Sequence, residues 1–402
     1  MSYFILPNIN IGITCSNLKL SFNLKSEIEE NHHITISHNT HKYVNIMKRK
    51  IDHHPKEWDE MKKYTNPYEF INTIIPYSKT SICKYKPISR AFFKLVELYN
   101  IFDILNFNSN INTFHLAEGP GGFIEATAYL RKNKKDKYYG ITLIKDDSNI
   151  PGWNKCEKLM HDYPNIIIEK GIDNTGNLYN FKNYIHCVNN YSNSMNIITA
   201  DGGFDFSSDF QEQETSATRL ILTQIFYAIS LQKFNGSFIL KIFDIFTNVT
   251  VEMIYLLSCF YKHVFISKPN TSRQANSEKY IVCKFFKFNN TSVLFEKIIN
   301  ILKVLEEKID LNTYYIKSIL NLNIQHVYTN KIEEINAILG QQQIENIRTT
   351  INHIVNKNHG KLETLKKYNI NKCIFWCEKN KLYHNTNPMN SNMFRNKSYM
   401  GK

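Results

Sequence analysis

The segment 114–126 constrains the fold of this chain more than any other. It reads Phe-His-Leu-Ala-Glu-Gly-Pro-Gly-Gly-Phe-Ile-Glu-Ala, an apolar run followed by a glycine turn and by apolar and small residues at helical spacing. The apolar run suits a strand covered on both faces. Gly119, Gly121 and Gly122 permit positive φ and lack a Cβ, so a ligand can lie against bare backbone, and Pro120 stiffens the turn. We expect a unit that receives a nucleotide-like ligand at the carboxyl edge of an α/β sheet, although a plain βα turn has the same pattern.

Strands and helices are predicted to alternate from residue 112 onward. The predicted strands are 114–118, 138–143, 166–170, 196–201, 237–243, 264–268 and 280–285. The predicted helices are 89–105, with Ser89 as its N-cap, and 123–131, 153–161, 181–189, 211–233 and 249–261. Only residues 269–279 link the last two strands, which is too short for a crossover helix, so these strands should be antiparallel neighbours. The predicted fold is therefore α/β, a doubly wound sheet of seven strands with the last one antiparallel.

Regions with other patterns flank this alternation. Before it, strands are expected near 3–6 and 18–24 and a helix near 58–64, and the basic run Lys48-Arg49-Lys50 reads as a solvated helix face. After about residue 290 the pattern becomes helical, with helices expected at 293–309, 314–322, 332–339 and 345–355. The predicted parts are an N-terminal α+β extension (1–75), a central domain (76–290), a C-terminal helical region (291–385) and a disordered tail (386–402).

Charge and cysteine usage restrict the partners and the compartment. Lys and Arg exceed Asp and Glu by 13 over 402 residues, which favours an anionic partner such as nucleic acid. The start lacks a signal peptide, and no apolar run reaches membrane-spanning length. We expect a reducing intracellular compartment with unpaired thiols and no membrane. Cys373, Cys377 and His384 have loose metal spacing, and the intervening Ile-Phe-Trp reads as core, so no metal site is expected.

Four ionisable residues fall at the ends of the predicted strands or beside them. Asp201 closes a strand and precedes Gly202-Gly203, and Glu278 opens the final strand. Lys241 interrupts an apolar strand, while Lys94 lies on the helix before the first strand. A lysine in a buried strand is costly unless it is paired, so Lys241 is the most informative residue. The alternative to a functional role is a structural ion pair between Lys241 and Asp201.

Five motifs occur in order between about residues 85 and 286. They are Ser89 to Leu95, Glu118 to Phe123, Thr199 to Phe204, Leu240 to Asp244 and Lys268 to Tyr280. Together they resemble the FtsJ/RrmJ-type 2′-O-ribose methyltransferases, most of all the mRNA cap (cap-1) 2′-O-methyltransferases of eukaryotes and large DNA viruses. The resemblance implies a Rossmann-like class I methyltransferase sheet and S-adenosylmethionine as methyl donor. The family's Lys-Asp-Lys-Glu catalytic tetrad corresponds to Lys94, Asp201, Lys241 and Glu278.

The implied reaction explains why such residues are needed. A ribose 2′-hydroxyl must lose its proton as it attacks the methyl group, and a lysine that accepts this proton has to be neutral. A second ammonium nearby and burial both favour the neutral form, and Lys94 is the expected neighbour of Lys241. We assign Lys241 as the base, and Lys94, Asp201 and Glu278 as orienting and electrostatic residues. Positioning of the reactants should supply most of the acceleration.

The resemblance also implies where the methyl donor lies. It would cover Glu118, Gly119, Pro120, Gly121, Gly122 and Phe123, with Asp201 beside it. The adenine would lie near 171–178, where Asp173 or Asn177 could bind its amino group, and we favour Asn177 with Leu178. Many methyltransferases end the second strand with an acid that binds the ribose, whereas this chain has Thr142-Leu143 and acids only at 146 and 147. The ribose contact therefore stays open.

The implied partner is capped RNA, together with other capping or transcription components. The candidate RNA contacts are Arg90, Gln211, Gln213, Lys268 and Arg273, whereas the run 131–137 reads as a solvated helix end. The leading interpretation is a methyltransferase acting on the first transcribed nucleotide of capped mRNA. The alternatives are a ribosomal or transfer RNA 2′-O-methyltransferase and a non-catalytic RNA-binding subunit of a capping assembly. The compartment would be cytoplasmic or nuclear, and cytoplasmic for a virus-encoded protein.

Overall fold

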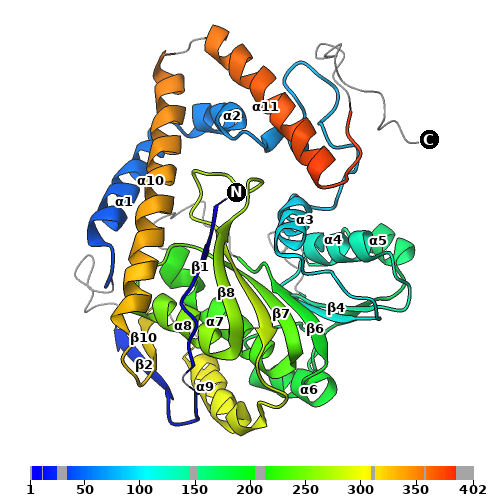
Figure 1. Cartoon of the computed structure of the whole chain (residues 1–402), viewed down its shortest axis with the longest axis vertical. Coiled ribbons are helices and arrows are strands. Elements are labelled where there is room, and N and C mark those ends of the chain that lie inside the picture. The colour runs from blue at the N-terminus through cyan, green and yellow to red at the C-terminus, as the bar shows by residue number, and fades with distance from the viewer. Residues whose placement is uncertain are drawn as a thin grey trace. The chain divides into compact units, whose positions relative to one another are not determined.

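The computed structural model describes residues 2–10, 12–24, 34–144, 152–203, 213–308, 313–356 and 359–385. The chain folds into two compact units (Figure 1). Unit 1 comprises residues 1–50 and 88–345, and unit 2 comprises residues 51–87 and 346–402. This grouping in space cuts across the consecutive parts expected from the sequence. Gln211, Phe204, Asp146, Asp147 and the expected tail 386–402 lie outside the described residues.

Unit 1 is built on an eight-stranded sheet with the order β1-β8-β9-β7-β6-β3-β4-β5. The strands are β1 (Ser2–Ile5), β3 (Asn112–Leu116), β4 (Lys137–Ile141), β5 (Ile166–Glu169), β6 (Met195–Ala200), β7 (Gln232–Ile242), β8 (Tyr261–Lys268) and β9 (Lys279–Phe286). Strands β3 to β7 are mutually parallel, and β9 runs antiparallel to both β7 and β8. The predicted sheet with one reversed strand is confirmed, and β1 adds an eighth, antiparallel strand beside β8.

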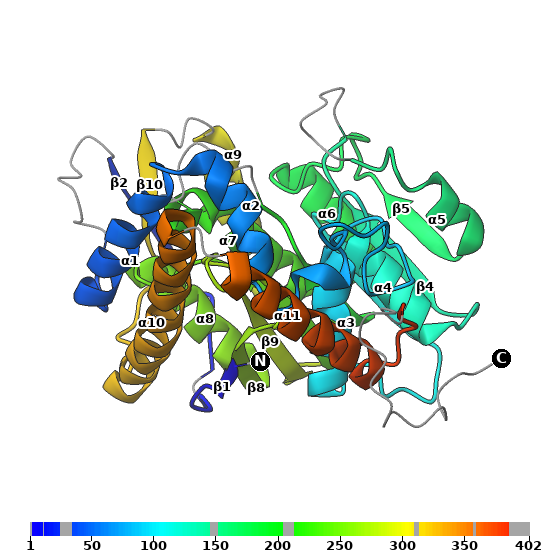
Figure 2. The ribbon, with the colours of Figure 1, turned by 90° about the horizontal axis from the view of Figure 1, so that it is seen from above.

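Helices cover both faces of this sheet, which is why its central strands are buried on both sides. The helices are α3 (Ala91–Phe102), α4 (Gly122–Arg131), α5 (Glu157–Asp162), α6 (Phe181–Tyr191), α7 (Gln213–Leu231), α8 (Asn248–Phe260) and α9 (Phe295–Glu307). Figure 2 shows α4 and α5 beside β4 and β5. Helix α3 packs on α4, while α6, α7, α8 and α9 contact one another on the other face. Phe114, Ile198 and Phe238 of the central strands are fully buried, as expected for a sheet covered on both faces.

The parallel strands bring four loops to one edge of the sheet. These loops follow β3, β4, β5 and β6 and contain residues 117–121, 142–144, 170–180 and 201–203. Strand β9 enters the sheet at the same edge, because Lys279 pairs with Ile242 at the end of β7. Residues that follow β6 and residues that precede β9 are thus close in space although they are far apart in the chain. This edge is where a doubly wound sheet accepts a ligand.

One predicted helix is wrong. Residues 314–322 were expected to be helical, but β10 (Tyr314–Leu320) is a strand that pairs antiparallel with β2 (Leu18–Leu24) in a separate two-stranded sheet. Aromatic and β-branched residues in this segment favour a strand. The partner strand lies almost 300 residues earlier in the chain, so the local pattern of apolar residues could not reveal it.

Two other predicted helices are parts of one continuous helix. The expected helices 332–339 and 345–355 form a single helix, α10 (His326–Asn356). Gly340 lies inside this helix, where an added Cβ would be 2.4 Å from the Thr40 side chain. Thr40 belongs to α1 (His38–Ile51), so the glycine permits close packing of α1 on α10.

Two side chains near helix ends also differ from expectation. Helix α3 begins at Ala91 after Arg90, which makes no side-chain cap, so Ser89 is not the N-cap that was predicted. Lys48 does not lie on a solvated face, because its side chain is 6% exposed and its ammonium is 2.9 Å from a carboxylate oxygen of Asp244. The basic run at 48–50 is thus partly internal.

Unit 2 contains α2 (Pro55–Thr65), the short helix η2 (Glu69–Ile71) and α11 (His359–Lys379). Its two chain segments are joined by hydrogen bonds such as those from Asn346 to the Thr65 carbonyl (3.1 Å) and from the Asn385 backbone to the Ile82 carbonyl (2.7 Å). Ile374 and Trp376 of α11 are buried, as the core interpretation of this segment predicted, but Phe375 between them is 65% exposed. Within the described ranges, every helix is too short or too polar to cross a membrane.

Candidate active site

Two lysine–carboxylate pairs lie at the carboxyl edge of the sheet in unit 1. The ammonium of Lys94 is 2.7 Å from Oε2 of Glu278, and that of Lys241 is 3.4 Å from Oδ1 of Asp201. All four side chains are between 10% and 16% exposed. Burial alone would raise the pKa of Glu278, but the charges of Lys94 and Lys241 hold this pKa well below its usual range. Both lysines therefore act on one carboxylate, and the four predicted residues form a single cluster.

Strand register explains why the cluster forms. Ala200 at the end of β6 pairs with Leu240 of β7, so Asp201 and Lys241, the next residue of each strand, are neighbours. The Lys241 ammonium also donates to the Asp201 backbone carbonyl (2.6 Å). Tyr280 of β9 pairs with Lys241 across the sheet, and its hydroxyl donates to Oδ1 of Asp201 (2.9 Å). The sequence motifs did not single out Tyr280, although its position opposite Lys241 follows from the antiparallel pairing of β7 and β9.

Helix α3 holds the loop that carries Glu278. Glu97, one turn after Lys94, accepts hydrogen bonds from the backbone of Asn270 (3.0 Å) and Thr271 (3.1 Å). Ser272 of the same loop donates to Oε1 of Glu278 (2.7 Å). The sequence motifs assigned no role to Glu97 or Ser272. A carboxylate on the apolar face of a helix, three residues after the candidate lysine, was the signal that pointed to Glu97.

Two residues predicted to contact RNA also bind the backbone of this loop. The buried Lys268 ammonium donates to the backbone carbonyls of Asn276 and Glu278, the latter at 2.6 Å. Burial and the nearby charge of Lys279 lower the pKa of Lys268 to about 7. The Arg90 guanidinium donates to the Thr271 carbonyl (3.0 Å). Contact of Lys268 and Arg90 with RNA stays a prediction.

The hydrogen bonds of this loop do not test the other residues that were predicted to bind RNA. Gln213 is the first residue of α7, and Arg273 lies in the loop before β9. Both stay predictions, as does Gln211, which lies outside the described residues.

The glycine turn after β3 is organised around the carboxylate of Glu118. Its Oε1 accepts hydrogen bonds from the backbone N–H groups of Phe123 and Ile124 at the start of α4, both at 2.8 Å. Its Oε2 is buried and has no hydrogen-bond partner within the described residues. Burial raises the pKa of Glu118 to about 8. One oxygen thus caps the helix, and the other is an acceptor that a bound molecule could satisfy.

The three glycines of this turn are explained by packing within the protein. Gly121 has φ of 112°, which side chains other than glycine rarely adopt. A Cβ on Gly122 would lie 2.2 Å from Oγ of Ser89, and one on Gly119 would lie 2.9 Å from the Gly152 carbonyl. Backbone conformation and packing are therefore enough to explain these glycines, without a ligand that lies against them.

The loop after β5 is folded tightly onto the end of β4. The carboxylate of Asp173 accepts hydrogen bonds from Thr175, Asn180 and Asn183, and these bonds hold its pKa below the usual range although burial acts in the opposite direction. A Cβ on Gly176 would lie 1.9 Å from the Thr142 carbonyl. Asp173 thus organises the loop, and the Asn177 side chain also accepts a hydrogen bond from the Tyr179 backbone (3.0 Å), so the adenine contact of either residue stays a prediction.

Within the described residues, no group of three His, Cys, Asp or Glu side chains could hold a metal ion.

Comparison with known proteins adds a family match to this geometry. Residues 87–286 match the profile of the FtsJ-like methyltransferases. Cap-specific mRNA (nucleoside-2′-O-)-methyltransferase 1 from Mus musculus is 31% identical over 245 residues, which cover 55% of this chain and 27% of that protein. Cap-specific mRNA (nucleoside-2′-O-)-methyltransferase 2 from Danio rerio is 32% identical over 218 residues, which cover 48% of this chain and 28% of that protein. The matched regions thus span less than a third of these relatives.

Solved structures also include similar proteins. A protein described as a ribosomal RNA methyltransferase from Plasmodium falciparum is 23% identical and aligns with a TM-score of 0.36, covering 49% of this chain and 97% of that chain.

Proposed function

The chain belongs to the FtsJ-like methyltransferase family, and from this premise we propose that it transfers a methyl group from S-adenosylmethionine to the ribose 2′-hydroxyl of the first transcribed nucleotide of capped mRNA. The observation that carries this proposal is the cluster of Lys94, Asp201, Lys241 and Glu278 at the carboxyl edge of the sheet. Similarity to two cap-specific methyltransferases supports capped mRNA as the substrate.

The residues at this edge fit S-adenosylmethionine. The Glu118–Phe123 turn, Asp201, Asn177 and Leu178 would hold it, and the unpartnered Oε2 of Glu118 offers a buried acceptor. Their loops all leave the carboxyl ends of parallel strands, where the ligand of such a sheet is expected. When bound, the sulfonium compound supplies an electrophilic methyl group, and its positive charge disappears on transfer.

Lys241 is proposed as the base. As the new oxygen–carbon bond forms, the O–H bond of the 2′-hydroxyl breaks and its proton passes to Nζ of Lys241. Both the backbone carbonyl and the carboxylate of Asp201 lie beside this nitrogen, so the ammonium that results is stabilised. The Tyr280 hydroxyl fixes the Asp201 carboxylate in turn. These contacts position the base before the substrate arrives.

Lys94 is proposed to hold the reacting hydroxyl oxygen. Its ammonium is fixed by Glu278, and Ser272 and the loop bound to Glu97 fix Glu278. A fixed positive charge next to the hydroxyl favours the partial negative charge that develops on oxygen as the proton leaves. In this arrangement each lysine is held by one carboxylate, and each carboxylate is held by a hydroxyl group from the loop or from β9.

The proposal is tested with purified protein, isotope-labelled methyl donor and three RNAs of one sequence: capped, uncapped, and capped with a 2′-deoxy first nucleotide. We expect label only on the capped RNA whose first nucleotide has a 2′-hydroxyl. Nuclease digestion and mass spectrometry should locate the label at the 2′-oxygen of that nucleotide. Lys241→Ala should lose transfer, whereas Lys262→Ala, an exposed lysine on β8, should not.

Each alternative predicts another result. Equal transfer to uncapped RNA would exclude cap specificity. Transfer that survives Lys241→Ala would exclude this base. RNA binding without transfer by the unaltered protein would favour a non-catalytic RNA-binding subunit.

A further inference from the structure

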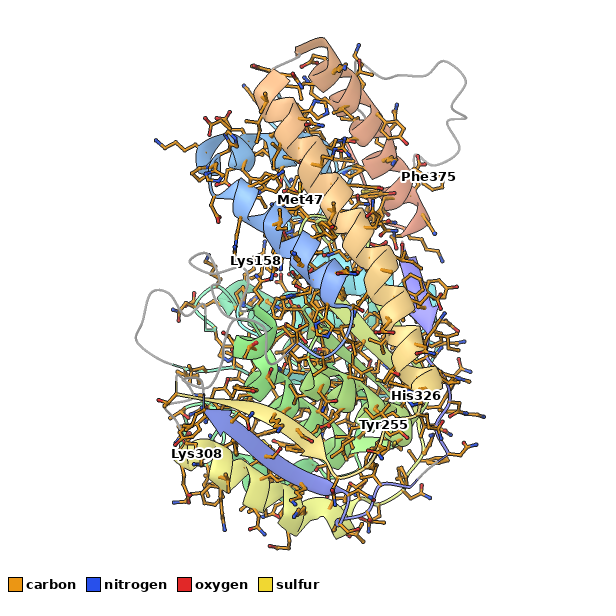
Figure 3. The ribbon with its side chains drawn as sticks, turned by 90° about the vertical axis from the view of Figure 1, so that its left-hand side faces the viewer. Met47, Lys158, Tyr255, Lys308, His326 and Phe375 are labelled. Carbon is orange, nitrogen blue, oxygen red and sulfur yellow. The ribbon has the colours of Figure 1, made fainter. Side chains whose placement is uncertain are left out.

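One face of α11 in unit 2 alternates basic and aromatic side chains. Tyr368, Lys372, Phe375 and Lys379 follow one another at spacings of four, three and four residues, which places them on one side of the helix. Tyr368 is 55% exposed and Phe375, labelled in Figure 3, is 65% exposed. Lys379 is exposed and Lys372 is half-buried. The two aromatic rings lie about 10 Å apart along the helix axis.

The apolar side of the same helix is already used. Ile370, Cys373, Ile374, Trp376 and Cys377 are buried in unit 2. Phe375 and Tyr368 are therefore not the edge of an incomplete core but belong to a second face of α11. An exposed aromatic residue standing alone needs no explanation, whereas two in register with lysines form a pattern that does.

Lysine and tyrosine side chains are arranged together on this face. The Lys372 ammonium lies 4.4 Å from the ring centre of Tyr368 and 6.0 Å from that of Tyr68. Such a cation–π contact holds the ammonium over one face of the ring, so that the opposite face can stack on a base while the ammonium meets the adjoining phosphate.

The charge of unit 2 indicates which partner fits. Residues 51–87 and 346–402 contain 17 Lys and Arg and 7 Asp and Glu, so this unit carries a net charge of +10 out of +13 for the whole chain. Unit 1, which is much larger, carries only the remaining +3. The centres of protein–protein interfaces are depleted in lysine, which argues against a protein partner on this face. Nucleic acid requires both the positive charge and the exposed rings.

We propose that the face of α11 formed by Tyr368, Lys372, Phe375 and Lys379 binds single-stranded RNA, with bases stacked on the two rings and phosphates at the two lysines. The site lies outside residues 87–286, which match the methyltransferase family. Binding here does not depend on the proposed reaction, because it needs neither the methyl donor nor a cap. This face would bind nucleotides of the RNA other than the one to be methylated.

The experiment measures fluorescence anisotropy of a labelled, unstructured, uncapped 20-nucleotide RNA with the full chain and no methyl donor. Tyr368→Ala/Phe375→Ala should weaken binding at least about tenfold, because stacking on both rings is lost, with the salt dependence unchanged. Lys372→Gln/Lys379→Gln should weaken binding several-fold and reduce the slope of log K against log salt concentration by about 1.4, or about 0.7 for each phosphate contact. Tyr368→Phe should bind normally because the ring remains.

The matched control is Lys233→Gln/Phe234→Ala, an exposed lysine and phenylalanine at the start of β7 in unit 1, which should leave binding unchanged. Thermal melting identifies any variant that fails to fold, and the lysine pair then decides the question. Unchanged affinity and salt slope in the lysine pair, or equal losses in the control, would overturn the proposal. A dimer of the unaltered chain that Tyr368→Ala/Phe375→Ala dissociates would overturn it in favour of a second copy as partner.

Discussion

Unit 1 contains two clusters of lysines and carboxylates that are similar in composition and different in construction. In the first, Lys94, Asp201, Lys241 and Glu278 form the proposed catalytic site. In the second, the Asp244 carboxylate lies between the ammonium groups of Lys48 (2.9 Å) and Lys279 (3.1 Å). The clusters are adjacent in sequence, because Asp244 follows Lys241 by three residues and Lys279 follows Glu278 directly.

Hydrogen bonding separates the two clusters. The Lys279 ammonium also donates to the carbonyls of Phe243 (3.1 Å) and Ser277 (2.9 Å), and the Ser277 hydroxyl donates to Asp244 (2.8 Å). Burial alone would raise the pKa of Asp244, yet the two lysines and Ser277 hold it far below its usual range. The side chains of Lys48, Asp244 and Lys279 are at most 9% exposed, against 10–16% in the first cluster.

The comparison teaches that a buried ion pair is not by itself a sign of catalysis. In the Asp244 cluster the Lys279 ammonium has a protein acceptor for each of its three protons, so nothing remains for a substrate. In the proposed site the Lys241 ammonium has two acceptors among the described residues, both from Asp201. The third position on the Lys241 nitrogen can therefore carry the lone pair of the neutral amine, and this lone pair is what a base requires.

The largest expected effect concerns activity at the first cluster. Lys241→Ala should lower kcat/KM by about 10³-fold or more, since it removes the proposed base, while the free energy of unfolding changes by less than about 1 kcal/mol. Labelled methyl transfer and urea denaturation measure the two quantities. A loss of stability comparable to that of an Asp244 variant would show that Lys241 is structural too and would break the comparison.

The largest expected effect on stability concerns the second cluster. Asp244→Ala leaves Lys48 and Lys279 buried without their carboxylate, so the free energy of unfolding should fall by about 3–5 kcal/mol. Urea denaturation of the full chain checks this. Replacing all three side chains at once, as Lys48→Met/Asp244→Leu/Lys279→Met, should restore most of the loss. A triple variant as unstable as the single one would contradict the assignment of the loss to unpaired charge.

Glu118 is a third buried carboxylate to compare with these clusters, and no lysine contributes to the shift of its pKa. That pKa is raised from 4.5 to about 8, so between these values the folded chain binds a proton that the unfolded chain has released. This contribution to stability is complete below about pH 4.5 and is lost as the pH rises to about 8, by a few kcal/mol. Glu118→Gln should remove the decline. Parallel curves of unfolding free energy against pH for both proteins would exclude Glu118 as its source.

The smallest expected effects come from a matched pair of serines. Ser277 donates to Asp244 and Ser272 to Glu278, at 2.8 Å and 2.7 Å, and both serines are 2% exposed. Ser277→Ala should lower the free energy of unfolding by about 1.5–3 kcal/mol and leave methyl transfer nearly unchanged. Ser272→Ala should lower kcat/KM several-fold, since Glu278 is less well fixed. Equal changes in stability and activity for the two variants would remove the distinction between the clusters.

The sequence was informative where chemistry and pattern disagreed. A lysine inside the apolar run of β7 and an aspartate at the end of β6 are costly without a reason, so Lys241 and Asp201 were visible without a structure. The doubly wound sheet followed from alternating strands and helices, and its reversed strand followed from one short connection.

The sequence was uninformative where a partner lies far along the chain. Lys48 belongs to an ordinary basic run, and its partner Asp244 is 196 residues away. The same holds for β10, whose apolar residues fit a helix until β2 is placed beside them. Glu118 was expected to contact a ligand, whereas its hydrogen bonds to the backbone of Phe123 and Ile124 depend on how the turn closes.

Unit 2 is built from two segments that are far apart in the chain, so during translation the first segment is made well before the second. Residues 51–87 leave the ribosome long before residues 346–385, and at roughly 5–20 residues per second the intervening chain takes on the order of 15–50 s to make. Phe70, Ile71 and Ile82, which are buried in the finished unit, must wait that long for the segment that completes their surroundings. The proposed methyltransferase domain can therefore be fully translated while the first half of unit 2 is still unassembled.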